Sequence, residues 1–154
     1  MIAPDDPNAP DVRALIELHL AFAREHTPEL DVHALEVDDL LADDISFFTY
    51  RRHGELVAMG ALKTLDAKHA ELKSMHTVES ARGQGIGRAM VEQLLEVAQH
   101  RGIERVSIET GPQEAFAPAR ALYTAAGFEP CASFGIYVGN TNSYCMTKVL
   151  PPRE

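Results

Sequence analysis

The sequence predicts a mixed α/β (α+β) fold in one domain, residues 1–154. We expect a central, mostly antiparallel twisted sheet of about six to seven strands flanked by about four helices. Three observations lead to this prediction. The 154 residues are enough to bury a core without disulfides. Short β-rich segments and helically periodic segments both recur along the chain. Tight turns separate the early strands, whereas helices separate the later ones.

The first half of the chain predicts two helices and a meander of three strands. Residues 1–10 contain three prolines and are expected to be extended, with a short edge strand. An amphipathic helix is expected over 11–25, capped by Asp11 and ended before Pro28, with a short helix over 36–42. The β-rich segments predict strands over 45–50, 56–65 and 70–78.

The second half begins with the clearest helix of the sequence. Apolar residues recur at helical spacing over 86–101, and Gly102 is typical of a helix C-terminus. A polar loop over 139–142 is expected to join the last two strands. The remaining elements follow in the order strand, helix, strand and strand, at 105–110, 116–126, 128–134 and 143–149.

The composition argues against several classes of protein. The formal net charge is −9 and the pI is about 5.2, so the chain lacks the basic face of a general nucleic-acid or membrane-surface binder. No apolar run approaches the ~18 residues of a membrane span, and the start of the chain lacks signal-peptide features. A cytoplasmic protein is therefore expected. The two cysteines and seven histidines show no metal-ligand spacing, so no metal site is expected.

The most informative stretch is Arg82-Gly83-Gln84-Gly85-Ile86-Gly87-Arg88, which follows an expected strand and begins the helix over 86–101. Glycines let a ligand approach the backbone, and the free N–H groups of the helix with its dipole form an anion site, usually for phosphate. A Walker loop is excluded because no Gly-Lys-Ser/Thr follows. The stretch also differs in register from a dinucleotide-binding loop. The acidic residue that such a loop has at a strand end about 20 positions on is missing here. Taken alone, the loop also suits a tight turn.

Two motifs together resemble the GNAT superfamily of N-acetyltransferases. The stretch 82–87 is similar to its R/Q-x-x-G-x-G/A pyrophosphate loop, and 121–128 is similar to its L-Y-x-x-x-G-F signature. The segments 71–75, 116–119 and 134–137 are more closely similar to a subgroup of small bacterial proteins assigned as acetyltransferases. The resemblance implies a single GNAT-like domain with a splayed strand pair that receives coenzyme A.

The resemblance also implies a function and a cofactor site. It implies an acetyl-CoA-dependent N-acetyltransferase in which the primary amine of a small molecule or peptide attacks directly in a ternary complex. The resemblance implies acetyl-CoA as the acyl donor and no metal. It does not decide whether the donor can carry a longer acyl group. Backbone and side-chain contacts to the coenzyme are expected from Met75, His76, Thr77, Arg82, Gly83, Gln84, Gly85, Ile86, Gly87 and Arg88.

Catalytic roles follow from the same resemblance. Tyr123 is expected to protonate the departing CoA thiolate, because a phenol with a pKa near ~10 is protonated at pH 7. A purely structural tyrosine is the alternative. The amine must be neutral to attack, so a general base is expected; Glu109 and Glu71 are the candidates and His76 is a third. Phe116-Ala117-Pro118 stands where the superfamily pattern has asparagine, which removes one familiar polar contact.

The sequence indicates the place of the acceptor pocket but not the acceptor amine. The acceptor pocket is expected between the first helices and the last loop, with His33, Phe134 and Tyr137 among its residues. The rival interpretation of the whole chain is a non-catalytic acyl-CoA-binding regulatory module. A homodimer through the closing strands is a further expectation, and neither nucleic acid nor a membrane is an expected partner. The sequence leaves the acceptor amine, the base and the oligomeric state open.

Overall fold

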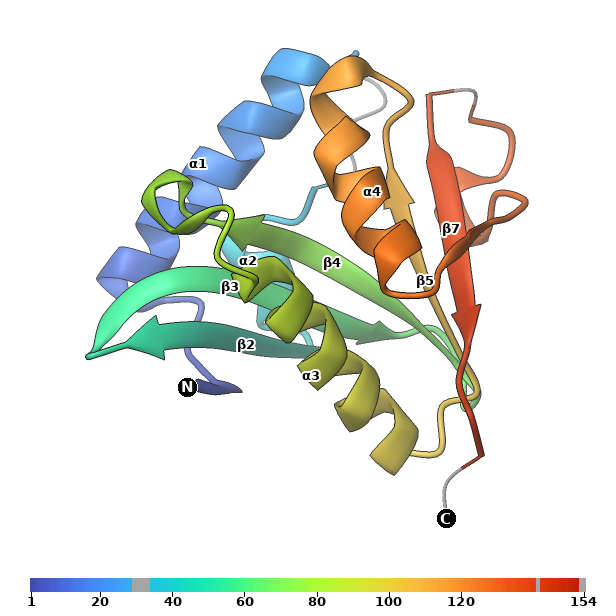
Figure 1. Cartoon of the computed structure of the whole chain (residues 1–154), viewed down its shortest axis with the longest axis horizontal. Coiled ribbons are helices and arrows are strands. Elements are labelled where there is room, and N and C mark those ends of the chain that lie inside the picture. Colours follow the sequence, from blue (N-terminus) through green and yellow to red (C-terminus); the bar gives the residue numbers. More distant parts are fainter. Residues whose placement is uncertain (29–33, 141, 153–154) are drawn as a thin grey trace.

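The computed structural model describes residues 1–28, 34–140 and 142–152. Within these ranges a seven-stranded sheet has the order β1-β2-β3-β4-β5-β7-β6 (Figure 1). The strands are β1 (Ile2–Pro4), β2 (Ile45–Arg52), β3 (Glu55–Thr64), β4 (His69–Thr77), β5 (Arg105–Thr110), β6 (Glu129–Pro130) and β7 (Tyr144–Val149). The helices are α1 (Pro10–His26), α2 (Val37–Leu40), α3 (Ile86–His100) and α4 (Ala117–Ala125). The predicted class is confirmed, with a mostly antiparallel sheet.

The first helix begins slightly differently from its prediction. Ala9 is the N-cap of α1 and Pro10 occupies the first helical position, where proline needs no hydrogen-bonded N–H. Asp11 therefore does not cap the helix. Its carboxylate accepts a hydrogen bond from Arg51 Nη1 at 2.6 Å and so ties α1 to β2. No helix in the described ranges is long and apolar enough to cross a bilayer.

The expected strand over 128–134 is the largest correction. Only β6, residues Glu129–Pro130, pairs with β7. Pro130 has no N–H to donate, and after Cys131 the chain leaves the sheet and forms a 3-10 turn, η4 (Gly135–Tyr137). This detour buries Tyr137, which is only 1 % exposed. The connection to β7 is therefore much longer than the predicted polar loop over 139–142, of which residue 141 lies outside the described ranges.

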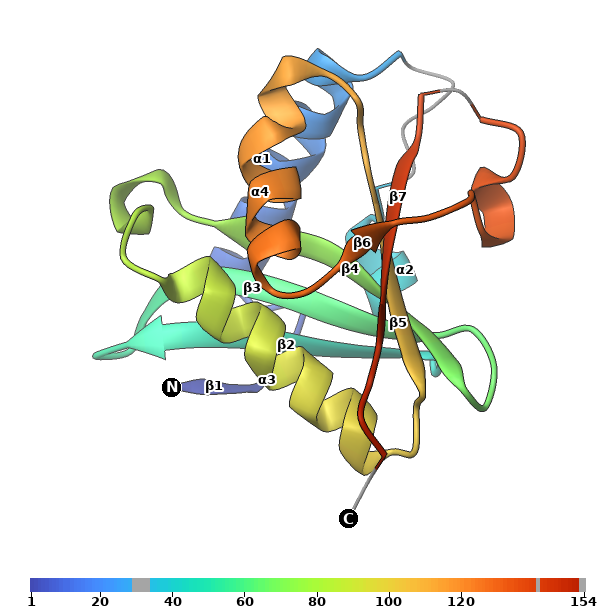
Figure 2. The same cartoon turned by 45° about the vertical axis from the view of Figure 1, so that its right-hand side comes forward.

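The strands β4 and β5 open into a V. They pair in parallel from His69 and Arg105 to Leu72 and Ile108, and the register ends there although both strands continue. Figure 1 shows the two strands meeting at the lower right and diverging toward the glycine loop and the top of the molecule. The helix α4 lies over this opening in both views (Figure 2). The expected splayed strand pair is present.

A β-bulge accompanies the divergence. The register between β3 and β4 shifts so that Ser74 and Met75 together lie opposite Gly60. Ser74 has a φ of 55°, a left-handed conformation that is uncommon for serine. A Cβ at Gly60 would lie 2.6 Å from Met75 Sδ, so glycine lets the bulged side chain fit. The bulge bends β4 away from β5 at the place where their pairing ends.

The core has two parts, one on each face of the sheet. The larger lies under α3 and α4, where Met90, Leu94 and Ala98 pack on Leu62 and Leu72. The smaller lies under α1 and α2 and includes the buried side chains Val12, Leu15, Ile16, Leu20, Val37, Leu40, Phe47 and Met59. Each fully buried side chain of this kind contributes about 1.5–3 kcal/mol. The helices thus cover both faces of the sheet.

Candidate active site

The glycine loop connects the end of β4 to α3. The chain passes through the 3-10 turn η2 (Glu79–Ala81) and then through Gly83 and Gly85, whose φ values of 76° and 78° suit glycine. Gly85 is the N-cap of α3. A Cβ at Gly87 would lie 3.2 Å from Leu122 Cδ2, so glycine here lets α3 lie close to α4. The first N–H groups of α3 are therefore presented beside an uncluttered backbone.

A groove of ≈ 470 Å³ runs along this loop and the end of β4. Every predicted coenzyme-contact residue except Gln84 lines it. The Gln84 side chain instead accepts a hydrogen bond from Arg52 Nη1 at 2.7 Å. The opposite wall comes from the 3-10 turn η3 (Glu114–Phe116) and from α4. The structure thus brings the loop, the strand and the tyrosine helix to one groove.

The backbone of β4 offers hydrogen bonds toward the opening of the V. The Val78 N–H donates to the Val57 carbonyl at 2.9 Å, so by the alternation of an antiparallel ladder the groups of Thr77 point away from β3. Arg82 Nε donates to the Thr77 carbonyl at 3.1 Å. The backbone of His76 faces β3 at this register, so what His76 presents to the site is its side chain.

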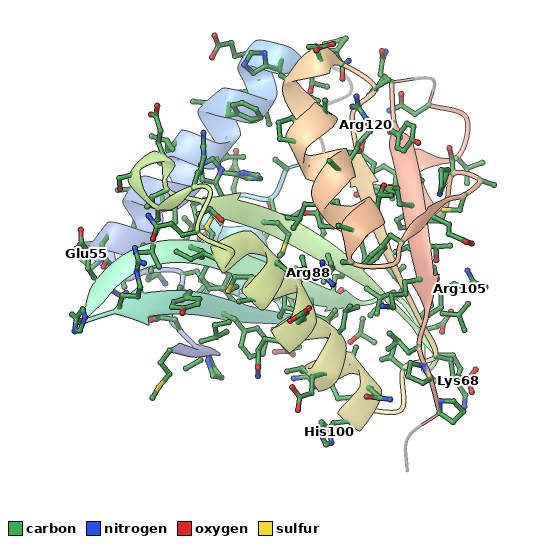
Figure 3. All side chains as sticks on the ribbon, in the orientation of Figure 1. Glu55, Lys68, Arg88, His100, Arg105 and Arg120 are labelled. Atoms are coloured by element: carbon green, nitrogen blue, oxygen red, sulfur yellow. The ribbon has the colours of Figure 1, made fainter. Side chains whose placement is uncertain are left out.

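Two arginines give the loop its positive charge. Arg82 and Arg88 are exposed at either end of the glycine run and line the groove. Arg88 lies in the first turn of α3, where its Nε is 2.9 Å from Glu92 Oε1 (Figure 3). Together with the positive end of the helix dipole, these side chains favour an anion at the start of α3.

A second cavity of ≈ 170 Å³ adjoins the groove. Side chains of α1, β4, β5, α4 and η4 form its walls. The two cavities share six lining residues and therefore meet: Phe22, Met75, His76, Phe116, Ala119 and Tyr123. The rings of Phe22 and Phe116 contact each other across this junction with centroids 5.6 Å apart.

Tyr123 lies at the junction, on the inner side of α4. It is 3 % exposed, and its ring packs edge-on against Phe128 with centroids 5.7 Å apart. Burial raises the pKa of the Tyr123 phenol above its ordinary value, because the phenolate would be desolvated. The hydroxyl therefore keeps its proton at physiological pH and is available as a donor.

Glu71, Lys73 and Tyr137 form a buried hydrogen-bonded cluster in the wall of the second cavity. The Tyr137 hydroxyl donates to Glu71 Oε2 at 2.5 Å, and Lys73 Nζ donates to the Tyr137 hydroxyl at 2.7 Å and lies 3.4 Å from Glu71 Oε2. Burial and the neighbouring Glu71 carboxylate raise the pKa of Tyr137. The Glu71 carboxylate is thus already paired. Sequence reasoning missed Lys73, although its alternation with Glu71 places both on one face of β4.

The other predicted acceptor-side residues occupy different places. Glu109 is half-buried on β5 and lines the second cavity. Phe134 packs behind Tyr137, with ring centroids 5.2 Å apart, rather than in the cavity wall. His33 lies outside the described residues. Across the described part of the chain, no three His, Cys, Asp or Glu side chains gather as metal ligands.

A pair of histidines joins α1 to β4 at the junction. His19 Nδ1 lies 3.0 Å from His76 Nδ1, and their rings meet edge-on with centroids 5.1 Å apart. Burial lowers the pKa of each to about 4, and Arg82 adds to the effect at His76. His76 Nε2 is buried without a hydrogen-bond partner. The two histidines are 57 positions apart in the sequence, so no local pattern indicates this pair.

Comparisons with known proteins agree with this geometry. The family model described as the acetyltransferase (GNAT) family matches residues 12–128. The chain is 38% identical over 146 residues to the uncharacterised N-acetyltransferase YsnE of Bacillus subtilis, and the match covers 95% of this chain and 97% of that protein.

Two solved structures show the same fold. A Klebsiella pneumoniae protein assigned as an acyl-CoA N-acyltransferase superposes with a TM-score of 0.80 at 26% identity, covering 97% of each chain. A GNAT family acetyltransferase from Elizabethkingia anophelis with acetyl-CoA bound superposes with a TM-score of 0.70 at 20% identity, again covering 97% of each chain. The chain therefore belongs to the acetyltransferase (GNAT) family and is an N-acetyltransferase.

Proposed function

We propose that this N-acetyltransferase transfers the acetyl group of acetyl-CoA to the primary amine of a small molecule or peptide, by direct attack in a ternary complex. The observation that supports this proposal is the junction of the two cavities at Tyr123. The groove of ≈ 470 Å³ suits an extended coenzyme arm, and the cavity of ≈ 170 Å³ suits a compact acceptor. A thioester at the junction would face an amine entering from the smaller cavity.

The residues of the groove fit a pyrophosphate and a pantetheine arm. The N-terminus of α3 offers unpaired N–H groups, and Arg82 and Arg88 balance negative charge. No atom lies within 4 Å of the Cβ positions of Gly83 and Gly85, so the backbone there is open to a ligand. The open edge of β4 offers the N–H of Thr77 to an extended amide-containing chain.

Tyr123 and the bulge divide the chemistry of the transfer. As the C–N bond forms and the C–S bond breaks, Tyr123 donates its phenolic proton to the leaving sulfur. An N–H of the bulged backbone near Met75 hydrogen-bonds the oxygen on which negative charge develops. Positioning of both reactants removes much of the entropic barrier, because the two cavities hold them at one junction.

The acidic wall of the smaller cavity indicates a cationic acceptor. Glu71 is paired with Lys73 and Tyr137, and Glu109 adds a second carboxylate to the same wall. The titratable wall residues Glu71, Lys73 and Glu109 therefore carry one more negative than positive charge, which attracts an ammonium and repels an anion.

Steady-state release of free thiol from acetyl-CoA, measured across a panel of amines, tests the proposal. We expect thiol release that depends on the amine, with the acetylated amine found by mass spectrometry. Acetyl-CoA binding by calorimetry without amine-dependent release from any panel member would favour the acyl-CoA-binding regulatory module instead. Propionyl-CoA in the same assay determines whether the donor site accepts a longer acyl group.

A further inference from the structure

We propose that His76 and His19 form a proton relay that takes the proton from the attacking amine. The proposal rests on the proposed acetyl transfer at the junction of the two cavities. His76 supplies the group that meets the amine, and His19 positions it and leads the proton toward solvent.

The first argument is position. Attack takes place where the groove and the smaller cavity meet, so the proton acceptor must reach both. Among the described residues, Tyr123 and His76 are the titratable side chains that line both cavities. Tyr123 keeps its proton for the leaving sulfur, whereas Glu71 and Glu109 line only the smaller cavity. His76 is therefore left as the acceptor.

The second argument is an unpartnered atom. His76 Nε2 is buried and has no hydrogen-bond partner, and a buried polar atom of this kind is costly unless a ligand pairs with it. The other ring nitrogen is already used, because His76 Nδ1 lies 3.0 Å from His19 Nδ1. If His76 Nδ1 carries the proton of that hydrogen bond, Nε2 presents a lone pair to the amine.

The third argument is charge. A hydrogen bond between two Nδ1 atoms needs one donor and one acceptor, so the pair cannot be doubly protonated in this geometry. Burial disfavours an imidazolium at either ring. A relay avoids that cost because each ring gives up one proton as it receives another. Both rings are partly exposed, but His76 Nε2 is buried without a partner and His19 Nε2 is not, so His19 provides the path to water.

The proton balance closes without an added reagent. The amine nitrogen forms the C–N bond and gives its proton to His76 Nε2. The Nδ1 proton of His76 then moves to His19 Nδ1, and the Nε2 proton of His19 goes to water. The C–S bond breaks and the sulfur takes the Tyr123 proton. The flow then reverses: His76 Nε2–H re-protonates the Tyr123 oxygen, the Nδ1 proton of His19 returns to His76 Nδ1, and water restores the Nε2 proton of His19. Amine and thioester have become amide and free thiol.

The tautomer of the resting pair tests the relay without any turnover. We expect ¹⁵N NMR of histidine-labelled protein to show His76 protonated at Nδ1 and unprotonated at Nε2, with signals assigned from His76→Gln and His19→Gln. The opposite tautomer, with a proton on His76 Nε2, would overturn the proposal. Because this readout needs no acceptor, it is separate from any failure to find amine-dependent thiol release.

Kinetics provide the second test. With the best amine of the panel, His76→Ala should lower kcat by about 100-fold at pH 7, as expected for loss of a general base. Its affinity for acetyl-CoA should stay within about twofold, because the substitution leaves the strand backbone in place. Added imidazole should restore part of kcat.

The controls separate catalysis from folding. His19→Phe keeps an aromatic ring but removes the acceptor nitrogen, so it should lower kcat with little change in KM for the amine. The matched control is His100→Ala, at the far end of α3 (Figure 3), which should leave kcat unchanged. A folded His76→Ala protein with wild-type kcat, or one that imidazole fails to rescue, would contradict the relay.

Discussion

Glu71 and Lys73 show how burial changes the part that a charged residue plays. The sequence suggested Glu71 as a base, but its side chain is 5% exposed, lies 3.4 Å from Lys73 and accepts a hydrogen bond from Tyr137. Taking two charges out of water is costly, so each depends on the other. Glu71 therefore serves the wall of the cavity, whereas His76, offered only as a third base, lies at the junction.

Removal of Lys73 should strongly destabilise the protein. We expect Lys73→Met to lower the free energy of unfolding by about 3–5 kcal/mol, because Glu71 is left buried without its cation. The matched control is Lys68→Met (Figure 3), which removes an ion pair to Glu104 on the surface. The side chains of Lys68 and Glu104 are 65% and 66% exposed. That loss should be at most about 1 kcal/mol. Urea denaturation measures both, and equal losses would contradict this interpretation.

Tyr123 should act through its hydroxyl. We expect Tyr123→Phe to lower kcat by about 100-fold, because the leaving sulfur loses its proton donor while the ring still packs on Phe128. The raised pKa of Tyr123 also predicts that its ionisation adds no alkaline decline to kcat below pH 10. Thiol release across pH measures both. The control is Tyr50→Phe, because Tyr50 on β2 lines neither cavity. Unchanged turnover in Tyr123→Phe would exclude the acid role of Tyr123.

At the scale of elements, the glycine loop depends on backbone conformation. Gly85 has a φ of 78° at the N-cap of α3, and no atom lies within 4 Å of its Cβ position. We therefore expect Gly85→Ala to cost about 1–2 kcal/mol through backbone strain alone, without a clash. Gly85→Asn should cost less, since asparagine adopts this conformation more readily. Urea midpoints measured without ligand test this, and identical midpoints for the two variants would contradict it.

The contact between α1 and β4 should make stability depend on pH. Burial lowers the pKa of His19 and His76 to about 4, from 6.5 in an exposed chain. Between these values the unfolded chain binds protons that the native pair does not, so stability is complete above pH 6.5 and falls as the pH drops toward 4.

A double variant isolates this contribution from other titrating groups. Between pH 7 and 4.5 the urea midpoint of the wild type should fall further than that of His19→Leu/His76→Leu. The carboxylates of Asp5 and Asp11, which pair with Arg51, titrate alike in both proteins and cancel in the comparison. If the urea midpoints of the two proteins fell equally with pH, the pKa values of His19 and His76 would not be lowered in the native state.

At the scale of the whole molecule, coenzyme binding should stabilise the fold. The groove joins β4, the glycine loop, η3 and α4, which come together only in the native state. Acetyl-CoA at 100 times its Kd should therefore add about 2.7 kcal/mol and raise Tm by about 5–10 °C. At the same acetyl-CoA concentration, Arg82→Ala should reduce the rise in Tm. Pantetheine, which lacks the pyrophosphate, should raise the Tm of the wild type less than acetyl-CoA at an equal concentration. Equal shifts with both ligands would contradict a pyrophosphate seat at Gly83–Arg88.

The homodimer stays a prediction at this scale. The edge strand β6 spans only two residues, and the turn that follows exposes Ile136 and Val138, which are 68% and 70% exposed. Light scattering of the purified protein decides between monomer and dimer.

The sequence by itself determined most of the elements and the resemblance of the glycine loop to that of the acetyltransferase (GNAT) family. Hydrophobic periodicity and glycine positions are local signals, and local signals specify helices, strands and turns. The expected strand over 128–134 is mostly absent: Glu129–Pro130 pair with β7, and after Cys131 the chain leaves the sheet and forms the turn η4.

Only the tertiary structure decided which side chains meet. The bulge at Ser74 and Met75 depends on the register against Gly60, and the opening of the V depends on where pairing with β5 stops. His19 and His76 are 57 residues apart, and Glu71 and Tyr137 are 66 residues apart. Contacts over such separations depend on how helices and strands pack. Packing, not local pattern, buries these groups and so shifts the pKa values of His19, His76 and Tyr137.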